Sequence, residues 1–231
     1  MNREPEPELM NRAEQVEAYS SADFSLGEAN FIKFIINYLD INRITLSHND
    51  LIVDLGCGPG NISEKLSNKW PNVNVLGIDG SLEMIKKAES KKYKTNLNNR
   101  YRNLSYLCED VRDINIDKIF FGKKISMLVS NSFIHHINQI DHFFDFIIKL
   151  SSPDTINFHK DLRRPKDKKA ALNLKTKCAD KFCDILTNDY YASLKASYRK
   201  NEVQKKIFEL NLNSMNVIEE TEEYLIVYGK V

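Results

Sequence analysis

The sequence predicts a doubly wound α/β fold, a mostly parallel seven-stranded sheet with helices on both faces and an antiparallel C-terminal hairpin. Short apolar runs alternate with helix-length amphipathic segments through most of the 231 residues, which is typical of a parallel sheet. The last two apolar runs have no helix-length segment between them and should pair as a hairpin. The first run ends in a glycine-rich loop, within LIVDLGCGPGN at 51–61, where such sheets place ligand-binding loops.

The first half of the chain shows the alternation clearly. Phe31, Phe34, Ile35 and Tyr38 recur at i, i+3, i+4 and i+7, the apolar stripe of an amphipathic helix. Ser81 is a candidate N-cap for a later helix. The other elements expected here are strands at 51–55, 73–79 and 104–110 and helices at 61–70 and 82–90.

The second half continues the pattern and then breaks it. We expect strands at 125–131 and 154–161, a helix around 140–148, a lysine-rich helical stretch at 166–187, and a late helix at 201–210. The strands at 215–220 and 223–231 form the terminal hairpin. The segment 94–103, KTNLNNRYRN, is the most loop-like internal stretch.

Composition excludes several classes of protein. The formal net charge of +1 does not suggest a dedicated nucleic-acid binder, and no apolar run approaches the roughly 18 residues of a membrane span. The acidic N-terminus has no apolar signal core. The four cysteines form no CxxC pair, so they indicate neither a zinc site nor a disulfide framework. We therefore expect a cytoplasmic protein without membrane partners and predict no metal site.

The glycine loop has three interpretations. Gly56, Gly58 and Gly60 suit close approach of a ligand to the main chain or a positive φ angle, although a tight turn without a ligand is an alternative. Dinucleotide sites use GxGxxG, whereas the spacing here is GxGxG and Asn61 holds the position of that last glycine. Phosphate loops of the Walker type need a GK[ST] ending, which is absent.

Four stretches of the sequence resemble motifs of a known family. VDLGCGPGN, GIDGS, CEDVRDI and SMLVSNSFIHHI resemble successive motifs of the class I (Rossmann-like) S-adenosylmethionine-dependent methyltransferases. The resemblance covers residues 45–160, and the terminal hairpin extends it to the end. It implies that Asp79 binds the ribose hydroxyls, that Asp110 meets the adenine amino group, and that Val111 lies against the ring.

The resemblance also implies a wider cofactor site. Asp54 either faces the amino-acid end of the cofactor or fixes the loop through main-chain N–H groups, and Cys57 is either functional or a small filler. Tyr19 either covers the cofactor or simply packs. The residues expected to contact S-adenosylmethionine are Asp54, Gly56, Cys57, Gly58, Gly60, Asn61, Asp79, Gly80, Asp110, Val111, Ser130 and Tyr19.

Catalytic and substrate-binding candidates follow the fourth and fifth strands. His135 and His136 stand where a general base would sit, although both could be structural. Asn131 either orients substrate or forms a turn. Arg163 and Arg164 could hold a carboxylate or phosphate. Alternatively, which we favour slightly, one pairs with a glutamate of a lid made by the N-terminal segment and the region after the fifth strand, and the other is solvated.

We expect a helical lid at 1–45 and a methyltransferase domain at 46–231 with a helical insertion at about 161–200. EPELMNRAEQVEAYSSADFS near the N-terminus, KDLRRP at 160–165 and YYASLKASY at 190–198 resemble a bacterial subgroup of undefined substrate. Residues 1–28 carry a net charge of −5 and residues 160–206 a net charge of +8, which could attract an acidic substrate or let the two segments pair.

The sequence thus predicts methyl transfer from S-adenosylmethionine to a small-molecule acceptor by in-line displacement. An RNA or protein methyltransferase is an alternative, but SNSFIHH stands where base-methylating relatives carry an (N/D)PP(Y/F) motif, so a nucleic-acid partner is disfavoured. A module that binds the cofactor without catalysis would carry the same loop. A nicotinamide oxidoreductase is disfavoured by the GxGxG spacing and the terminal hairpin.

Overall fold

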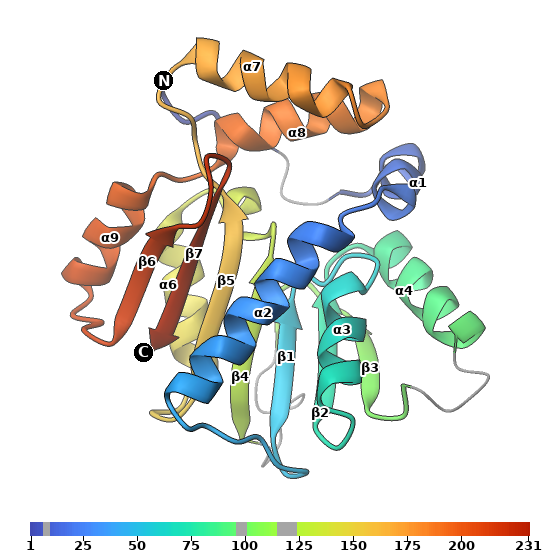
Figure 1. Cartoon of the computed structure of the whole chain (residues 1–231), viewed down its shortest axis with the longest axis vertical. Coiled ribbons are helices and arrows are strands. Elements are labelled where there is room, and N and C mark those ends of the chain that lie inside the picture. The colour runs from blue at the N-terminus through green and yellow to red at the C-terminus, as the bar shows by residue number, and fades with distance from the viewer. Residues whose placement is uncertain (7–9, 96–100, 115–123) are drawn as a thin grey trace.

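In the computed structural model, the apolar runs of the sequence form a sheet in the order β3-β2-β1-β4-β5-β7-β6 (Figure 1). The structure describes residues 1–6, 10–95, 101–114 and 124–231. The first five strands pair in parallel, and β7 pairs antiparallel with both β5 and β6. The strands are β1 (Leu51–Leu55), β2 (Asn74–Asp79), β3 (Leu104–Cys108), β4 (Ile125–Asn131), β5 (Ile156–Leu162), β6 (Met215–Glu219) and β7 (Tyr224–Lys230).

Helices cover both faces of this sheet, because successive side chains of a buried strand point to opposite faces. In β1, Ile52 joins the apolar cluster under α2 and α3, and its neighbour Val53 joins the cluster under α6 and α9. The helices are α1 (Ala13–Ser21), α2 (Ser25–Ile41), α3 (Asn61–Lys69), α4 (Leu82–Thr95), α6 (Ile140–Leu150), α7 (Lys168–Ala179), α8 (Asp184–Ala196) and α9 (Lys200–Glu209), with a short 3-10 turn, η2 (Ile134–His136).

The strand order reverses between β1 and β4. The chain runs outward from β1 to β2 and β3 and then returns to β4 on the other side of β1. Helix α3 follows β1 on one face, whereas α6 follows β4 on the other. The loops after β1 and β4 therefore diverge and leave a crevice at the carboxyl ends of the strands, where ligands bind in doubly wound sheets.

Three helices lie over this crevice and are called the roof: α1, α7 and α8 (Figure 1). Helix α7 packs on α8, and α8 contacts both α1 and η2. A small apolar cluster of Leu162, Leu174 and Leu194, joined by Tyr190 and Tyr224, ties α7 and α8 to the ends of β5 and β7. Among the described residues, no helix is both long and apolar enough to cross a bilayer.

The predicted α/β fold is confirmed in strand number, direction and layering. The lysine-rich stretch differs from the prediction in one respect, because it forms two helices: α7 ends at Ala179 and α8 begins at Asp184. The loop expected at 94–103 lies partly outside the described residues. Its first two residues, Lys94 and Thr95, still belong to α4.

Candidate active site

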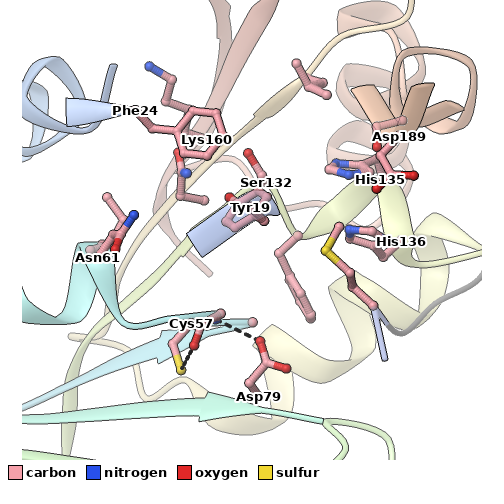
Figure 2. Close-up of a pocket in the computed structure, with 18 of the residues that line it drawn as sticks. Tyr19, Phe24, Cys57, Asn61, Asp79, Ser132, His135, His136, Lys160 and Asp189 are labelled. Atoms are coloured by element: carbon pink, nitrogen blue, oxygen red, sulfur yellow. Dashed lines mark hydrogen bonds between the residues drawn. The ribbon is translucent and has the colours of Figure 1, made fainter. Parts of the chain in front are cut away.

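A cavity of about 890 Å³ lies between the strand ends and the roof (Figure 2). Its floor includes the loop after β1, the end of β2 and the segment after β4, and its upper wall includes residues of α1, α7 and α8. This volume is near the upper end of the ~300–1,000 Å³ range of small-molecule sites. One continuous cavity thus meets both the glycine loop and the histidine pair.

The three glycines of the loop all have positive φ angles, 63° at Gly56, 52° at Gly58 and 81° at Gly60. A Cβ atom on Gly56 would collide with the ring of Phe133, and one on Gly60 would collide with the side chain of Tyr106. A Cβ atom on Gly58 would meet no protein atom within 4 Å. The backbone at Gly58 is therefore open to the cavity, whereas the other two glycines are required by packing.

Asp79 lies at the end of β2 and lines the cavity. Its carboxylate accepts the main-chain N–H of Gly58 at 2.8 Å and that of Ser81 at 2.8 Å. Burial raises the pKa of Asp79, and these two donors only partly offset it. Each oxygen keeps a lone pair beyond its one protein donor, so the carboxylate can accept two further hydrogen bonds from a vicinal diol.

Asp54, at the fourth position of β1, is also buried against the cavity. The hydroxyl of Ser63 donates to Asp54 Oδ2 at 2.6 Å. Burial raises the pKa of Asp54 to about 7, a shift that the Ser63 hydrogen bond opposes and the nearby Asp79 carboxylate increases. Asp54 thus both anchors the first turn of α3 and borders the cavity.

Cys57 and Asn61 serve the packing of the loop. Cys57 is buried, its N–H donates to the carbonyl of Ile78 at 3.0 Å, and burial raises the pKa of its thiol. Asn61 donates to Glu28 at 2.8 Å and accepts from Lys91 Nζ at 2.5 Å, which links α2, α3 and α4. Both residues line the cavity, but the side chain of Asn61 is already engaged.

The loop after β3 contributes Asp110 and Val111, and Gly80 borders the same cavity after β2. Arg112 donates to Asp110 through Nε at 2.8 Å and through Nη2 at 2.5 Å. This hydrogen-bonded guanidinium lowers the pKa of Asp110. The carboxylate is therefore ionised and oriented at the cavity edge.

Aromatic rings and a buried lysine form part of the upper wall. The Tyr19 ring centroid lies 4.9 Å from that of Phe24, and burial raises the pKa of Tyr19. Lys160, from β5, was missed by sequence analysis. Its Nζ lies 2.6 Å from Glu220 Oε2 and 4.7 Å from the Tyr224 ring centroid. A cation inside a predicted strand was the available signal, because such a charge needs a buried partner.

The turn η2 places the two histidines on the cavity, and a residue missed by sequence analysis holds them. Asp161, buried in β5, accepts the N–H groups of Phe133, Ile134 and His135. Its other oxygen lies 2.5 Å from His135 Nδ1. Asp161 stands in the KDLRRP segment, where the prediction favoured the two arginines.

Glu6 of the N-terminal segment reaches both histidines. Its Oε1 lies 3.4 Å from His135 Nε2 and 3.5 Å from His136 Nδ1. Burial lowers the pKa of His135, but the carboxylates of Asp161 and Glu6 outweigh it and the net shift is upward. Sequence analysis did not single out Glu6, since nothing in the local pattern marks one glutamate of an acidic stretch.

Four predicted residues, Gly60, Ser130, Arg163 and Arg164, are not part of the cavity lining, while Asn131 lines it as expected. Ser130 is buried in β4, with its hydroxyl 2.9 Å from His159 Nδ1. Arg163 pairs with Glu219 at 3.0 Å, and Arg164 pairs with Glu202 of α9 and donates to the Ser197 carbonyl. Neither arginine lines the cavity here, and both pair with glutamates of the C-terminal region rather than of the N-terminal segment, so their contact with a substrate stays a prediction.

Comparisons with known proteins agree with this site. Residues 52–154 match a family model described as a methyltransferase domain. The malonyl-[acyl-carrier protein] O-methyltransferase of Bacillus anthracis is 21% identical over 206 residues, which cover 80% of this chain and 71% of that enzyme. The trans-aconitate 2-methyltransferase of Azoarcus sp. is 46% identical over 46 residues, covering 20% of this chain and 18% of that enzyme.

Two solved structures show the same fold. The plantazolicin methyltransferase BpumL, in complex with a triazolic desmethylPZN analog and SAH, matches with a TM-score of 0.70 and 14% identity, over 94% of this chain and 90% of that one. A SAM-dependent methyltransferase from Aquifex aeolicus matches with a TM-score of 0.63 and 16% identity, over 94% and 98%.

The fold, the glycine loop and these matches define a methyltransferase of the Rossmann-like class. The chain contains a methyltransferase domain at residues 52–154 and is similar in fold to S-adenosylmethionine-dependent methyltransferases, which supports S-adenosylmethionine as its cofactor. The residues present fit that molecule. Gly58 leaves main chain open to the cavity, and Asp79 keeps acceptor capacity for a diol.

Proposed function

We propose that this protein methylates a small-molecule acceptor held between the histidine pair and the roof. The observation that carries the proposal is the continuity of one cavity of about 890 Å³ from the glycine loop to His135 and His136. Such a space suits a cofactor together with a compact acceptor better than a nucleic-acid or protein surface. The overall net charge of +1 also argues against a nucleic-acid partner.

The cofactor site would be divided among three strand ends. Asp79 would accept the ribose hydroxyls, the main chain at Gly58 would lie against the cofactor, and Asp110 with Val111 would border the adenine. When bound, S-adenosylmethionine supplies a methyl group already activated by the sulfonium charge. The chain therefore has to align the acceptor and exclude water, and these two effects can lower the activation barrier by several kcal/mol.

The roof would provide the exclusion of water. Tyr19 and Phe24 stack over the cavity, and α7 and α8 complete the cover. We propose that the N-terminal segment up to the end of α1 and the insertion at about 161–200 act together as a lid, whereas α2 packs on the sheet. Four free cysteines, with Cys183 exposed, suit a reducing compartment such as the cytoplasm.

The proposal is tested by methyl transfer from labelled S-adenosylmethionine into three pools prepared separately: metabolites, total RNA and proteins. We expect label in the metabolite pool only, and none with the Asp79→Ala variant. Label in RNA or protein would contradict the small-molecule assignment. Tight cofactor binding with no label in any pool would instead favour a binding module without catalysis.

A further inference from the structure

Two histidines and a glutamate from distant parts of the chain meet at the acceptor end of the cavity. His135 Nε2, His136 Nδ1 and Glu6 Oε1 all lie within 4.8 Å of one another. Glu6 Oε1 is 3.4 Å from the first nitrogen and 3.5 Å from the second. Tetrahedral zinc with bonds of about 2.0–2.2 Å separates its ligand atoms by about 3.3–3.6 Å. The two distances from Glu6 Oε1 to the histidine nitrogens therefore already have the required length.

From this geometry we propose that Glu6, His135 and His136 bind a divalent transition-metal ion of the Zn²⁺ type. Two imidazoles with one carboxylate suit Zn²⁺, Fe²⁺, Co²⁺ or Ni²⁺, whereas Mg²⁺ and Ca²⁺ take oxygen ligands. His135 and His136 both line the cavity, and Figure 2 shows their rings side by side. Their ring centroids are 4.2 Å apart.

Asp161 supports His135 in the way that a carboxylate commonly supports a metal-binding histidine, by accepting a hydrogen bond from its other ring nitrogen. It lies 2.5 Å from His135 Nδ1, so the ring donates its Nδ1 proton to the carboxylate and leaves the Nε2 lone pair for an ion. Asp161 is itself held by three main-chain N–H groups. The ring orientation is thus fixed before any ion arrives.

Glu6 is held in place independently of the histidines. The hydroxyl of Ser193 donates to Glu6 Oε1 at 2.9 Å. Arg3 anchors the same segment by donating to four main-chain carbonyls, and its guanidinium lies 4.1 Å from the Tyr198 ring centroid. The carboxylate is therefore positioned by contacts that do not depend on a proton shared with His135.

A further carboxylate near this cluster lacks a partner on one oxygen. Asp189 of α8 lines the cavity beside the histidines (Figure 2). Its Oδ1 accepts from Gln15 Nε2 at 2.9 Å, whereas its buried Oδ2 has no hydrogen-bond partner among the described residues. An unpaired buried carboxylate oxygen is costly, and a cation or a cation-bound water at the cluster would satisfy it.

The consequence for the acceptor rests on the proposed function, whereas ion binding itself does not. An ion held by three protein ligands keeps a position for an exogenous oxygen. Here that position would take a hydroxyl or carboxylate of the acceptor and lower the pKa of a bound hydroxyl. We therefore assign the acceptor to the class of small molecules with an oxygen that coordinates a metal.

The test uses the full-length protein after treatment with a chelator, titrated calorimetrically with Zn²⁺. We expect one Zn²⁺ per chain, and Co²⁺ in its place should give a visible absorption band. Glu6→Gln and His136→Ala should each weaken Zn²⁺ binding at least tenfold. Glu4→Gln, in the same segment, and His142→Ala, at the same cavity, are the matched controls and should bind as the unaltered protein does.

S-adenosylhomocysteine binding is measured on every variant to show that the cofactor site is intact. Absence of stoichiometric Zn²⁺ binding, with S-adenosylhomocysteine still bound, would overturn the metal site and leave the proposed function standing. Zn²⁺ binding that is equal in Glu6→Gln, His136→Ala and both controls would also overturn it. Label in RNA or protein in the transfer assay would instead overturn the acceptor assignment alone.

Discussion

The three glycines of the loop after β1 are required for two different reasons. Gly56 and Gly60 face Phe133 and Tyr106, so a side chain there would displace packed atoms. Gly58 faces the cavity, and its N–H is held by Asp79. The sequence motif alone does not distinguish these roles, because all three positions have positive φ angles and only tertiary contacts separate them.

Gly58→Ala should therefore separate binding from folding. We expect a modest loss of stability, about 1 kcal/mol for the positive φ angle, and a loss of cofactor affinity of tenfold or more, because the new methyl group enters the cavity. Gly60→Ala should lose more stability, because its Cβ collides with Tyr106. Urea unfolding and calorimetry together check this, and equal stability of the two variants would contradict it.

Asp54 gives a prediction for the pH dependence of stability. Its folded-state pKa of about 7 lies above the ordinary value of 3.8. Its contribution to stability is therefore complete below pH 3.8 and is lost as pH rises through 7. We expect the unaltered protein to lose up to about 4 kcal/mol relative to Asp54→Asn between pH 4 and pH 8. Urea unfolding at several pH values measures it, and a difference independent of pH would refute it.

The limits of prediction are also clear at the residue scale. Asp79 and Asp110 could be predicted because strand-end positions follow from local pattern, and both line the cavity. Arg163 and Arg164 could not be placed, since their partners Glu219 and Glu202 lie in the last strands and helices of the chain. Ion pairs between distant segments leave no local signal.

At the scale of elements, the position of η2 depends on one carboxylate from the neighbouring strand. Asp161 accepts three N–H groups of this turn and faces the His135 ring. Strand–helix alternation predicted β4 and β5 correctly, but it could not predict the short turn between β4 and α6. The histidines were therefore predicted by motif and their support was not.

Asp161→Asn should destabilise the protein by about 2–4 kcal/mol. Both carboxylate oxygens of Asp161 accept hydrogen bonds, whereas an amide has only one acceptor oxygen. Asp141→Asn is the control, since Asp141 is exposed and pairs only at the surface with Lys206. Its effect should be much smaller. Urea unfolding of both variants checks the prediction, and similar losses in the two would show that Asp161 does not hold the turn.

For the whole molecule, the sheet could be predicted from strand–helix alternation, whereas the roof could not. Helix α1 and residues 1–6 contact α8, about 180 residues later in the chain. Charge asymmetry gave pairing of the two segments as one of two interpretations, and Glu4 does pair with Lys195 at 2.5 Å. These distant contacts hold the upper wall of the cavity in place, so its volume is a property of the tertiary structure alone.

Arg3→Ala should loosen the roof without unfolding the sheet. The variant loses four hydrogen bonds to main-chain carbonyls and the contact with Tyr198. We expect faster amide hydrogen exchange in residues 10–21 and in α8, with unchanged exchange in β1 and β4. Arg12→Ala, an exposed control, should leave all of these rates as they are. Uniformly faster exchange in Arg3→Ala would mean that the roof is not a separate unit.

The central claim is that S-adenosylmethionine binds over the open main chain at Gly58 with its ribose on Asp79. Calorimetric titration of S-adenosylhomocysteine into the unaltered protein and into Asp79→Ala tests it most directly. The account predicts micromolar affinity for the first and at least a tenfold loss, about 1.4 kcal/mol, for the second, with no binding of NAD to either. Equal affinity of the two proteins, or binding of NAD, would contradict it.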